Sequence, residues 1–237
     1  MADPFSSWME GPIKLEDRMR GFTYLSKIYD AQKWTPDKAD PLQKANVPLL
    51  KRPTPSIPVL NQKLDGAPQT MPLSNILLCT DYGLYQPYET GQSTTITEEQ
   101  YYVQFWQHVD TFVYFGHQRL AIPPPSWVNA GHRNGAQVLG LLINEGDARK
   151  DPDTMALLDR DSHNNYWLAD KLGQMASCYG FDGWFVNIEA HVEETKGTWN
   201  DGKSMKDFLI QLRNALVKYG VPGGGKVVWY VHPVKAP

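Results

Sequence analysis

Five short, almost continuously apolar segments recur along the chain, and they constrain its fold more than any other feature. Each is rich in β-branched or aromatic residues. Strands buried on both faces of a parallel sheet have this composition, because helices cover the sheet. The sequence therefore predicts five strands, at residues 75–82, 111–117, 137–145, 183–189 and 226–230.

Stretches with helical spacing lie between these segments, and several of their ends carry helix-end signals. Thr97 and Gln100 form a capping box, and Gly180 and Gly220 stand where helix C-termini favour glycine. Alternating strands and helices predict an α/β protein with right-handed crossovers. The pattern leaves a TIM-type barrel and a doubly wound sheet open, although no GxGxxG follows the first strand. The predicted helices cover residues 97–109, 125–135, 166–180 and 204–220.

A proline-rich stretch precedes the first strand. Eight of the 18 prolines fall between Pro36 and Pro72. Proline lacks a backbone donor and moves the preceding residue out of the helical region, so this stretch is expected to run extended along a surface. It is either a plain linker or an ordered belt packed on the domain. We expect an N-terminal extension over residues 1–74, the α/β domain over 75–230 and a divergent tail over 231–237.

Charge and composition narrow the class of protein. The chain has 23 basic and 26 acidic residues and a net charge of −3, which does not fit a nucleic-acid binder. Its apolar runs are shorter than the roughly 18–20 residues of a membrane span, and the N-terminal residues do not resemble a signal peptide. Cys79 and Cys178 have no CxxC spacing, which favours a reducing compartment. We expect a cytosolic protein without nucleic-acid or membrane partners.

The segment YGFDGWFVNIEAH, residues 179–191, is the most informative about chemistry. Alternate residues of a strand face the same way, so Phe185, Asn187 and Glu189 share one face while the residues between them pack against helices. In barrels, catalytic residues collect at the C-terminal ends of the strands. The alternative is structural, with both polar side chains satisfying neighbouring backbone groups.

An Asn-x-Glu pair has a specific use in glycoside hydrolysis. A carboxylic acid whose pKa is raised by a partly apolar site can protonate a glycosidic oxygen. In substrate-assisted enzymes the sugar's own 2-acetamido oxygen attacks the anomeric carbon and forms an oxazoline. A side-chain amide such as that of Asn187 can orient the acetamide while Glu189 supplies the acid. The pair therefore favours an N-acetylhexosamine substrate.

Sequence resemblance supports this interpretation. DGWFVNIE, residues 182–189, resembles the D-G-x-D-x-D-x-E signature of family 18 chitinases, but Phe185 and Asn187 replace two of its carboxylates. Asn-x-Glu is instead the pattern of family 85 glycoside hydrolases. Residues 112–140, KVVWY and GFTYLSKIYDAQKW are also similar to that family, so the resemblance covers most of residues 21–230.

The resemblance implies a TIM-type (β/α) barrel and an endo-β-N-acetylglucosaminidase. Such enzymes cleave between the two GlcNAc residues of the N-glycan core and are cytosolic in eukaryotes, which makes N-glycans or N-glycoproteins the expected partners. The resemblance assigns Glu189 as the acid/base and Asn187 as the residue that orients the acetamide. Tyr230 matches a family tyrosine that helps to position the acetamido group.

Two further residues are expected to contact substrate. Glu145 matches an acidic residue at the end of the third strand, although Gly146 follows where the family usually has Trp. His117 ends the second strand and either touches sugar hydroxyls or makes ordinary hydrogen bonds. We expect no cofactor and no metal, because His191 has no ligand spacing with another His or Cys.

The strand count departs from the family. A TIM barrel has eight strands, whereas five are predicted here and the sequence after Tyr230 reads VHPVKAP. We therefore expect a partial barrel with about five of eight strands. The alternatives to an active endoglycosidase are a catalytically silent fragment or glycan-binding remnant, and a chitinase-like hydrolase. Glycan preference and oligomeric state stay open.

Overall fold

The computed structural model describes residues 24–25, 27–53, 56–64, 67–72, 75–81, 103–144, 153, 156–189 and 203–230. All five predicted strands are present in that part of the chain. They run parallel, and each pairs with the next predicted strand. Their bounds are β4 Leu77–Asp81, β5 Thr111–Phe115, β7 Gln137–Asn144, β8 Gly183–Ile188 and β9 Lys226–Tyr230.

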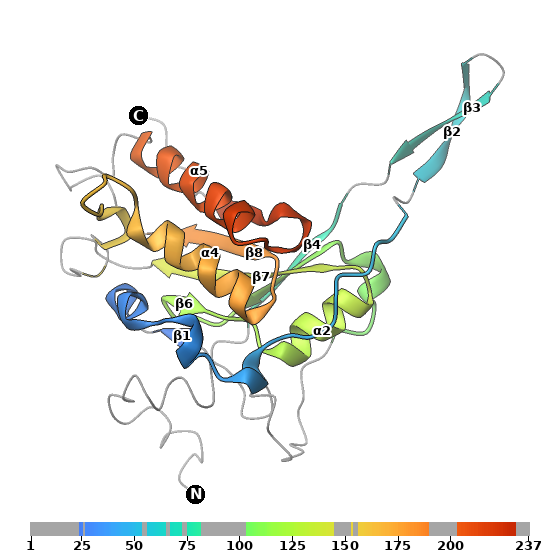
Figure 1. Ribbon diagram of the computed structural model, residues 1–237. Helices are drawn as coiled ribbons and strands as arrows, with labels where there is room; N and C mark the ends of the chain where they lie inside the picture. The colour runs from blue at the N-terminus through green and yellow to red at the C-terminus, as the bar shows by residue number, and fades with distance from the viewer. Residues whose placement is uncertain are drawn as a thin grey trace, which may run out of the picture.

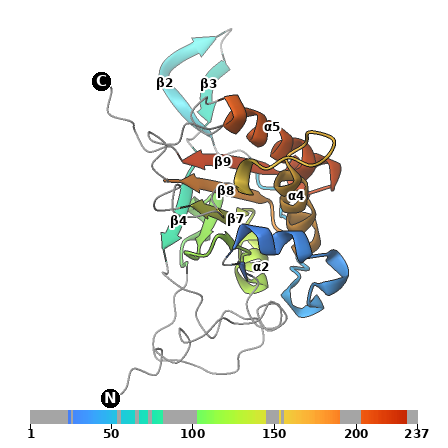
Figure 2. The ribbon, with the colours of Figure 1, turned by 90° about the vertical axis from the view of Figure 1, so that its left-hand side faces the viewer.

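The three predicted helices in the described part after β5 are confirmed. They are α2 (Pro125–Arg133), α4 (Trp167–Tyr179) and α5 (Lys203–Lys218). Gly180 ends α4 with a φ of 80°, in the left-handed conformation that glycine adopts without steric cost. Figures 1 and 2 show the three helices on one side of the parallel strands. The chain therefore has an α/β fold built on a parallel sheet.

The predicted helix over residues 97–109 is wrong for its described part. Residues 97–102, with the expected capping box, lie outside the described residues, and the rest forms only the 3₁₀ turn η6 (Trp106–His108). Arg52 from the N-terminal segment donates to the carbonyls of Gln107 and Val109 at 3.0 and 2.6 Å. These contacts satisfy carbonyl groups near the start of β5 without a continuing helix.

Residues 27–53, which include the first half of the proline-rich stretch, form an ordered belt packed on the domain, whereas the second half of the stretch does not. Three short 3₁₀ turns punctuate it: η2 (Ile28–Lys33), η3 (Pro36–Lys38) and η4 (Pro41–Gln43). Trp34 is buried and donates its indole N–H to the hydroxyl of Tyr179 at 3.0 Å. Further along, β2 (Ser56–Leu64) and β3 (Ala67–Pro72) form an antiparallel hairpin that projects from the body of the molecule in Figure 1.

Two short strands are additions to the parallel sheet that the sequence pattern did not predict. β6 (Leu120–Ala121) pairs antiparallel with β7 at Leu142 and Leu141, and β1 (Tyr24–Leu25) pairs with β6. The remaining short turns are η7 (Ala156–Leu158) and η8 (Pro222–Gly224). The N-terminal segment therefore adds to the sheet edge near the C-terminal half of β7.

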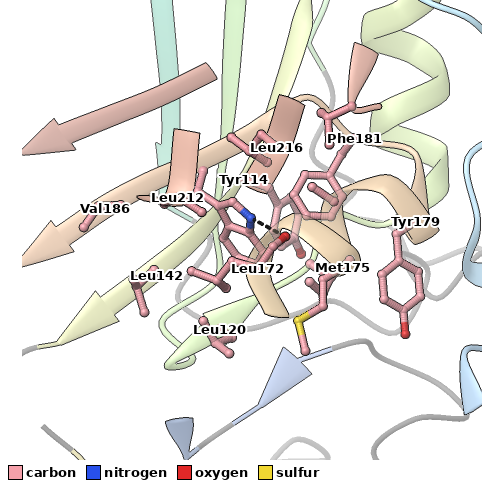
Figure 3. Close-up of a cluster of buried hydrophobic side chains, with 14 of the residues drawn as sticks. Tyr114, Leu120, Leu142, Leu172, Met175, Tyr179, Phe181, Val186, Leu212 and Leu216 are labelled. Atoms are coloured by element: carbon pink, nitrogen blue, oxygen red, sulfur yellow. Dashed lines mark hydrogen bonds between the residues drawn. The ribbon is translucent and has the colours of Figure 1, made fainter. Parts of the chain in front are cut away.

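The two faces of the sheet bury very different clusters. On the helix side, side chains from β5, β7 and β8 pack with residues of α2, α4 and α5 in one large core, part of which is drawn in Figure 3. Trp184 lies in this core, with its indole N–H donating to the carbonyl of Leu172 at 3.0 Å. The opposite face holds a smaller cluster: Val113, Ala121, Leu139, Leu141, Ile143 and Phe185.

The N-terminal edge of the sheet is fixed by a buried ion pair. Asp182 precedes β8, is fully buried, and accepts from His132 Nε2 at 2.8 Å and from the Val138 amide at 2.7 Å. The other ring nitrogen of His132 lies 2.6 Å from the Val47 carbonyl oxygen of the belt. Burial lowers the pKa of His132, but its hydrogen bond to Asp182 and that residue's charge outweigh burial and raise the pKa. Both residues are buried and bonded to neighbouring elements, so their role here is structural.

Candidate active site

The candidate site lies at the C-terminal end of β8, on the face opposite the helices. Phe185 belongs to the smaller cluster, while Trp184 and Val186 belong to the helix-side core. This confirms the alternation predicted for the strand. Asn187 follows on the same face as Phe185, and Glu189 comes directly after the last residue of β8.

Asn187 and Glu189 contact each other through their side chains. The Asn187 amide nitrogen donates to Glu189 Oε1 at 3.2 Å. Asn187 is only 2% exposed, and within the described part of the chain its Oδ1 atom is buried without a hydrogen-bond partner. Glu189 is exposed, so its carboxyl group is open to a ligand. A buried, unsatisfied acceptor beside an accessible carboxyl group is costly unless a ligand completes it.

Tyr230 lies beside this pair because β9 pairs with β8 in register. Asn187 is the register partner of Tyr230, and the Tyr230 ring stacks on Phe185 with centroids 6.4 Å apart and planes at 27°. Tyr230 is 43% exposed, so part of the residue is open to a ligand. The structure therefore brings three of the predicted site residues, Asn187, Glu189 and Tyr230, to one edge of the sheet.

His117 lies at the same edge, and a chain of aromatic rings links it to Phe185. Its ring makes an edge contact with Phe115 at 4.9 Å, and Phe115 contacts Phe185 at 6.4 Å. Its Nε2 atom lies 2.9 Å from Asp81 Oδ1 at the end of β4. Sequence reasoning missed Asp81 and Phe115. Their positions at the last residues of two parallel strands were the signal that could have found them.

Glu145 lies outside the described residues, but its neighbour Asn144 is described and fully buried. The Asn144 side-chain oxygen accepts from Arg119 Nη1 at 2.7 Å, and its backbone carbonyl accepts from the Glu189 amide at 2.8 Å. Neither Asn144 nor Arg119 was a candidate from sequence, because their positions follow from pairing between β7 and the segment around β6.

Metal ligands do not gather at this edge in the described residues. That part of the chain holds no group of three or more His, Cys, Asp or Glu side chains arranged to hold a metal ion. Its helices also include none that is long and apolar enough to cross a bilayer. The chemistry available at the described site is that of a carboxyl group, an amide, a phenol and an imidazole.

Comparison with known proteins places these residues in a family. Residues 85–233, which include His117, Asn187, Glu189 and Tyr230, match the model of glycosyl hydrolase family 85. The chain belongs to this family. It is 33% identical over 214 residues to the cytosolic endo-beta-N-acetylglucosaminidase of Mus musculus, and the alignment covers 87% of the chain and 25% of that protein.

Two further comparisons agree with the family 85 assignment. The cytosolic endo-beta-N-acetylglucosaminidase 2 of Arabidopsis thaliana is 37% identical over 133 residues, which cover 56% of this chain and 18% of that protein. The glycoside hydrolase domain of Endo-D from Streptococcus pneumoniae R6 shares the fold with a TM-score of 0.60 at 22% identity, over 87% of this chain and 30% of that one. The chain thus spans about a quarter or less of the curated relatives that it matches here.

Proposed function

We propose that this chain carries the catalytic strand of an endo-β-N-acetylglucosaminidase that hydrolyses the GlcNAc–GlcNAc bond of the N-glycan core. The observation that carries the proposal is the Asn187–Glu189 pair. Asn187 is buried, and its side-chain oxygen has no partner among the residues that the structure describes; Glu189 presents an exposed carboxyl group 3.2 Å from the Asn187 amide nitrogen. An N-acetyl sugar supplies both a donor for the amide oxygen and an oxygen for the acid to protonate.

The mechanism uses the substrate's own acetamide as nucleophile. Glu189 donates its proton to the glycosidic oxygen as the bond to the anomeric carbon breaks. The acetamido oxygen attacks that carbon and forms the oxazoline in its protonated, oxazolinium form, while Asn187 Oδ1 accepts the N–H that it keeps and so stabilises the positive charge. Water then opens the oxazoline, with Glu189 taking its proton and returning to the acid form. This route retains the anomeric configuration.

The other site residues act on the substrate's position. Tyr230, in register with Asn187, orients the acetamido group through its hydroxyl. The ring of Phe185 beneath it and the ring of Phe115 provide an apolar floor for sugar rings. We assign His117, paired with Asp81, to sugar hydroxyl groups, and Glu145 to substrate contact.

We further propose that the five parallel strands are consecutive strands of a TIM-type barrel. Their order along the sheet never reverses, and α2, α4 and α5 all pack in the core on one face. A doubly wound sheet reverses its strand order and carries helices on both faces. In this arrangement the smaller cluster faces the barrel interior, and the site occupies the C-terminal mouth. By analogy with its relatives, we place the protein in the cytosol, acting on N-glycoproteins.

The test is mass spectrometry of a high-mannose glycoprotein after incubation with the purified 237-residue chain. We expect asparagine residues bearing a single GlcNAc, and none with Glu189→Gln. A second measurement follows binding of a GlcNAc-thiazoline, a stable mimic of the oxazoline, by calorimetry. Thiazoline binding without cleavage, by a folded sample, would replace the enzyme with a glycan-binding protein. A folded sample that shows no cleavage and no thiazoline binding would overturn the proposal. Cleavage of chitin oligomers without cleavage of the glycoprotein would indicate a chitinase.

A further inference from the structure

Arg119 connects three separate parts of the chain just behind the candidate site. Its Nη1 atom donates to Asn144 Oδ1 at 2.7 Å, and its Nε atom lies 3.9 Å from Asp153 Oδ2. Asp153 in turn accepts from the amides of Ile28 and Tyr29 at 2.6 and 3.2 Å. The N-terminal segment, the connection after β7 and the end of β7 therefore meet at one guanidinium group.

The same residue is tied to the backbone that carries the acid. The Arg119 carbonyl accepts from the Ile143 amide at 3.0 Å, and the Asn144 carbonyl accepts from the Glu189 amide at 2.8 Å. Arg119 thus holds β7 through both its backbone and its side chain, one hydrogen bond away from Glu189. A guanidinium group suits this task because its planar donors are fixed relative to one another.

Arg119 and Asn144 lie on the face of the strands opposite the candidate site, so they do not act on the substrate directly. Asn144 pairs with Ile188 in register, and both alternate with Ile143 and Asn187, whose side chains belong to the site face. Asn144 is also 0% exposed. Arg119 therefore acts through Asn144, on the opposite side of the strands from the position proposed for the sugar.

We propose that Arg119 is a positioning residue that sets the backbone at the ends of β7 and β8, and with it the placement of Glu189. This role rests on the proposed function, since it concerns where the acid stands relative to the glycosidic oxygen. Misplacement of a catalytic group by about 1 Å can lower a rate by about 100-fold. The loss should fall on kcat and leave KM nearly unchanged, because Arg119 contacts no sugar.

The test uses Arg119→Lys, which keeps the charge and loses the rigid fork. Two substrates are compared: a natural glycopeptide, and the same oligosaccharide on a nitrophenyl leaving group that departs with little protonation. We expect kcat to fall up to about 100-fold on the glycopeptide and several-fold less on the aryl glycoside. Hydrogen exchange of the Glu189 amide should become faster in the same variant.

Two further variants make the test specific. Asn144→Asp keeps an oxygen that accepts from Arg119 and should retain more activity than Asn144→Leu. Arg52→Lys is the matched control, because Arg52 also donates to backbone carbonyls but lies near the start of β5. It should change neither the leaving-group dependence nor the exchange of the Glu189 amide.

The outcomes distinguish this role from the proposed function. An equal loss of kcat on both substrates in Arg119→Lys, or unchanged hydrogen exchange of the Glu189 amide, would overturn the positioning role. The proposed function would still stand in that case, provided that the wild-type chain turns over the glycopeptide. A wild-type chain that neither cleaves nor binds the thiazoline overturns the proposed function, and the positioning role of Arg119 in the reaction with it, even if Arg119→Lys changes the exchange.

Discussion

The two ends of the parallel sheet use the same kinds of side chain for opposite purposes. At the N-terminal end, Asp182 is 0% exposed and His132 is 1% exposed; Asp182 Oδ2 accepts two hydrogen bonds, while its buried Oδ1 has no partner within the described part of the chain. At the C-terminal end, Glu189 is exposed and its amide neighbour Asn187 keeps a buried acceptor without a partner in the described part. A carboxylate that is fully enclosed stabilises the fold, whereas one left open can exchange protons with a ligand.

The two ends of β9 show the same contrast between an enclosed polar side chain and an exposed one. Lys226 is half-buried and donates to Thr111 Oγ1 at 2.6 Å. Burial lowers the pKa of Lys226, while the charges of Asp110 and Asp182 oppose that decrease. At the other end of the same strand, Tyr230 is 43% exposed. One strand therefore goes from an internally bonded polar group to an open one over five residues.

The largest effect is expected from Glu189→Gln at the open end. This change keeps the shape but removes the transferable proton, so turnover should fall by about 100- to 10,000-fold. Because the side chain is exposed, the free energy of unfolding should change by less than about 0.5 kcal/mol. Product analysis and urea unfolding of the same sample measure both quantities. If Glu189→Gln lowered the free energy of unfolding by as much as is expected below for Asp182→Ala, the comparison of the two ends would be wrong.

Asp182→Ala should have the opposite profile. It leaves the His132 ring and the Val138 amide without their buried acceptor, and breaking a buried ion pair costs about 3–5 kcal/mol. Lys218→Ala is the control, since the exposed Lys218 pairs with Asp170 at 2.7 Å on the surface and its loss should cost no more than about 1 kcal/mol, while Asp170 keeps its hydrogen bonds from Tyr219 and Gln174. Urea unfolding gives both values. Similar losses of unfolding free energy in the two variants would contradict the large contribution to stability assigned to the buried pair.

The sign of the pH dependence sharpens the same comparison. The folded-state pKa of His132 is raised above its unfolded value, so the folded protein holds this proton more tightly than the unfolded chain. The resulting stability is fully present below the unfolded pKa, near 6.5, and is lost as the pH rises through the folded pKa. Urea unfolding across this range should show the decline, and His132→Gln should remove it. A decline of equal size in that variant would assign the effect to other groups.

The fold was largely readable from the sequence, whereas the support of the site was not. The five strands and the face shared by Phe185 and Asn187 follow from local apolar pattern and alternation. Arg119 donates to Asn144 from 25 positions away, and Asp153 accepts from the Ile28 amide 125 positions away, so no local pattern encodes their meeting. The wrong prediction of a helix near Trp106 has a similar cause, because Arg52, from a distant segment, donates to the carbonyl groups of this turn.

The smallest effect compares neighbouring aromatic residues on opposite faces of β9. Tyr230 and Trp229 are similarly exposed, at 43% and 42%, but only Tyr230 shares the face of its register partner Asn187. Tyr230→Phe keeps the stacked ring and removes one hydroxyl, so it should slow turnover by no more than about tenfold, the worth of a single hydrogen bond. Trp229→Phe should leave turnover unchanged, and neither change should alter the fold.

Steady-state kinetics on one glycopeptide, with circular dichroism of both variants, makes the comparison. Equal slowing by both variants would mean that the edge of the sheet, rather than the Tyr230 hydroxyl, matters to the reaction. A loss confined to Tyr230→Phe would place the acetamido group between Tyr230 and Asn187, at the end where the sheet keeps its polar groups open.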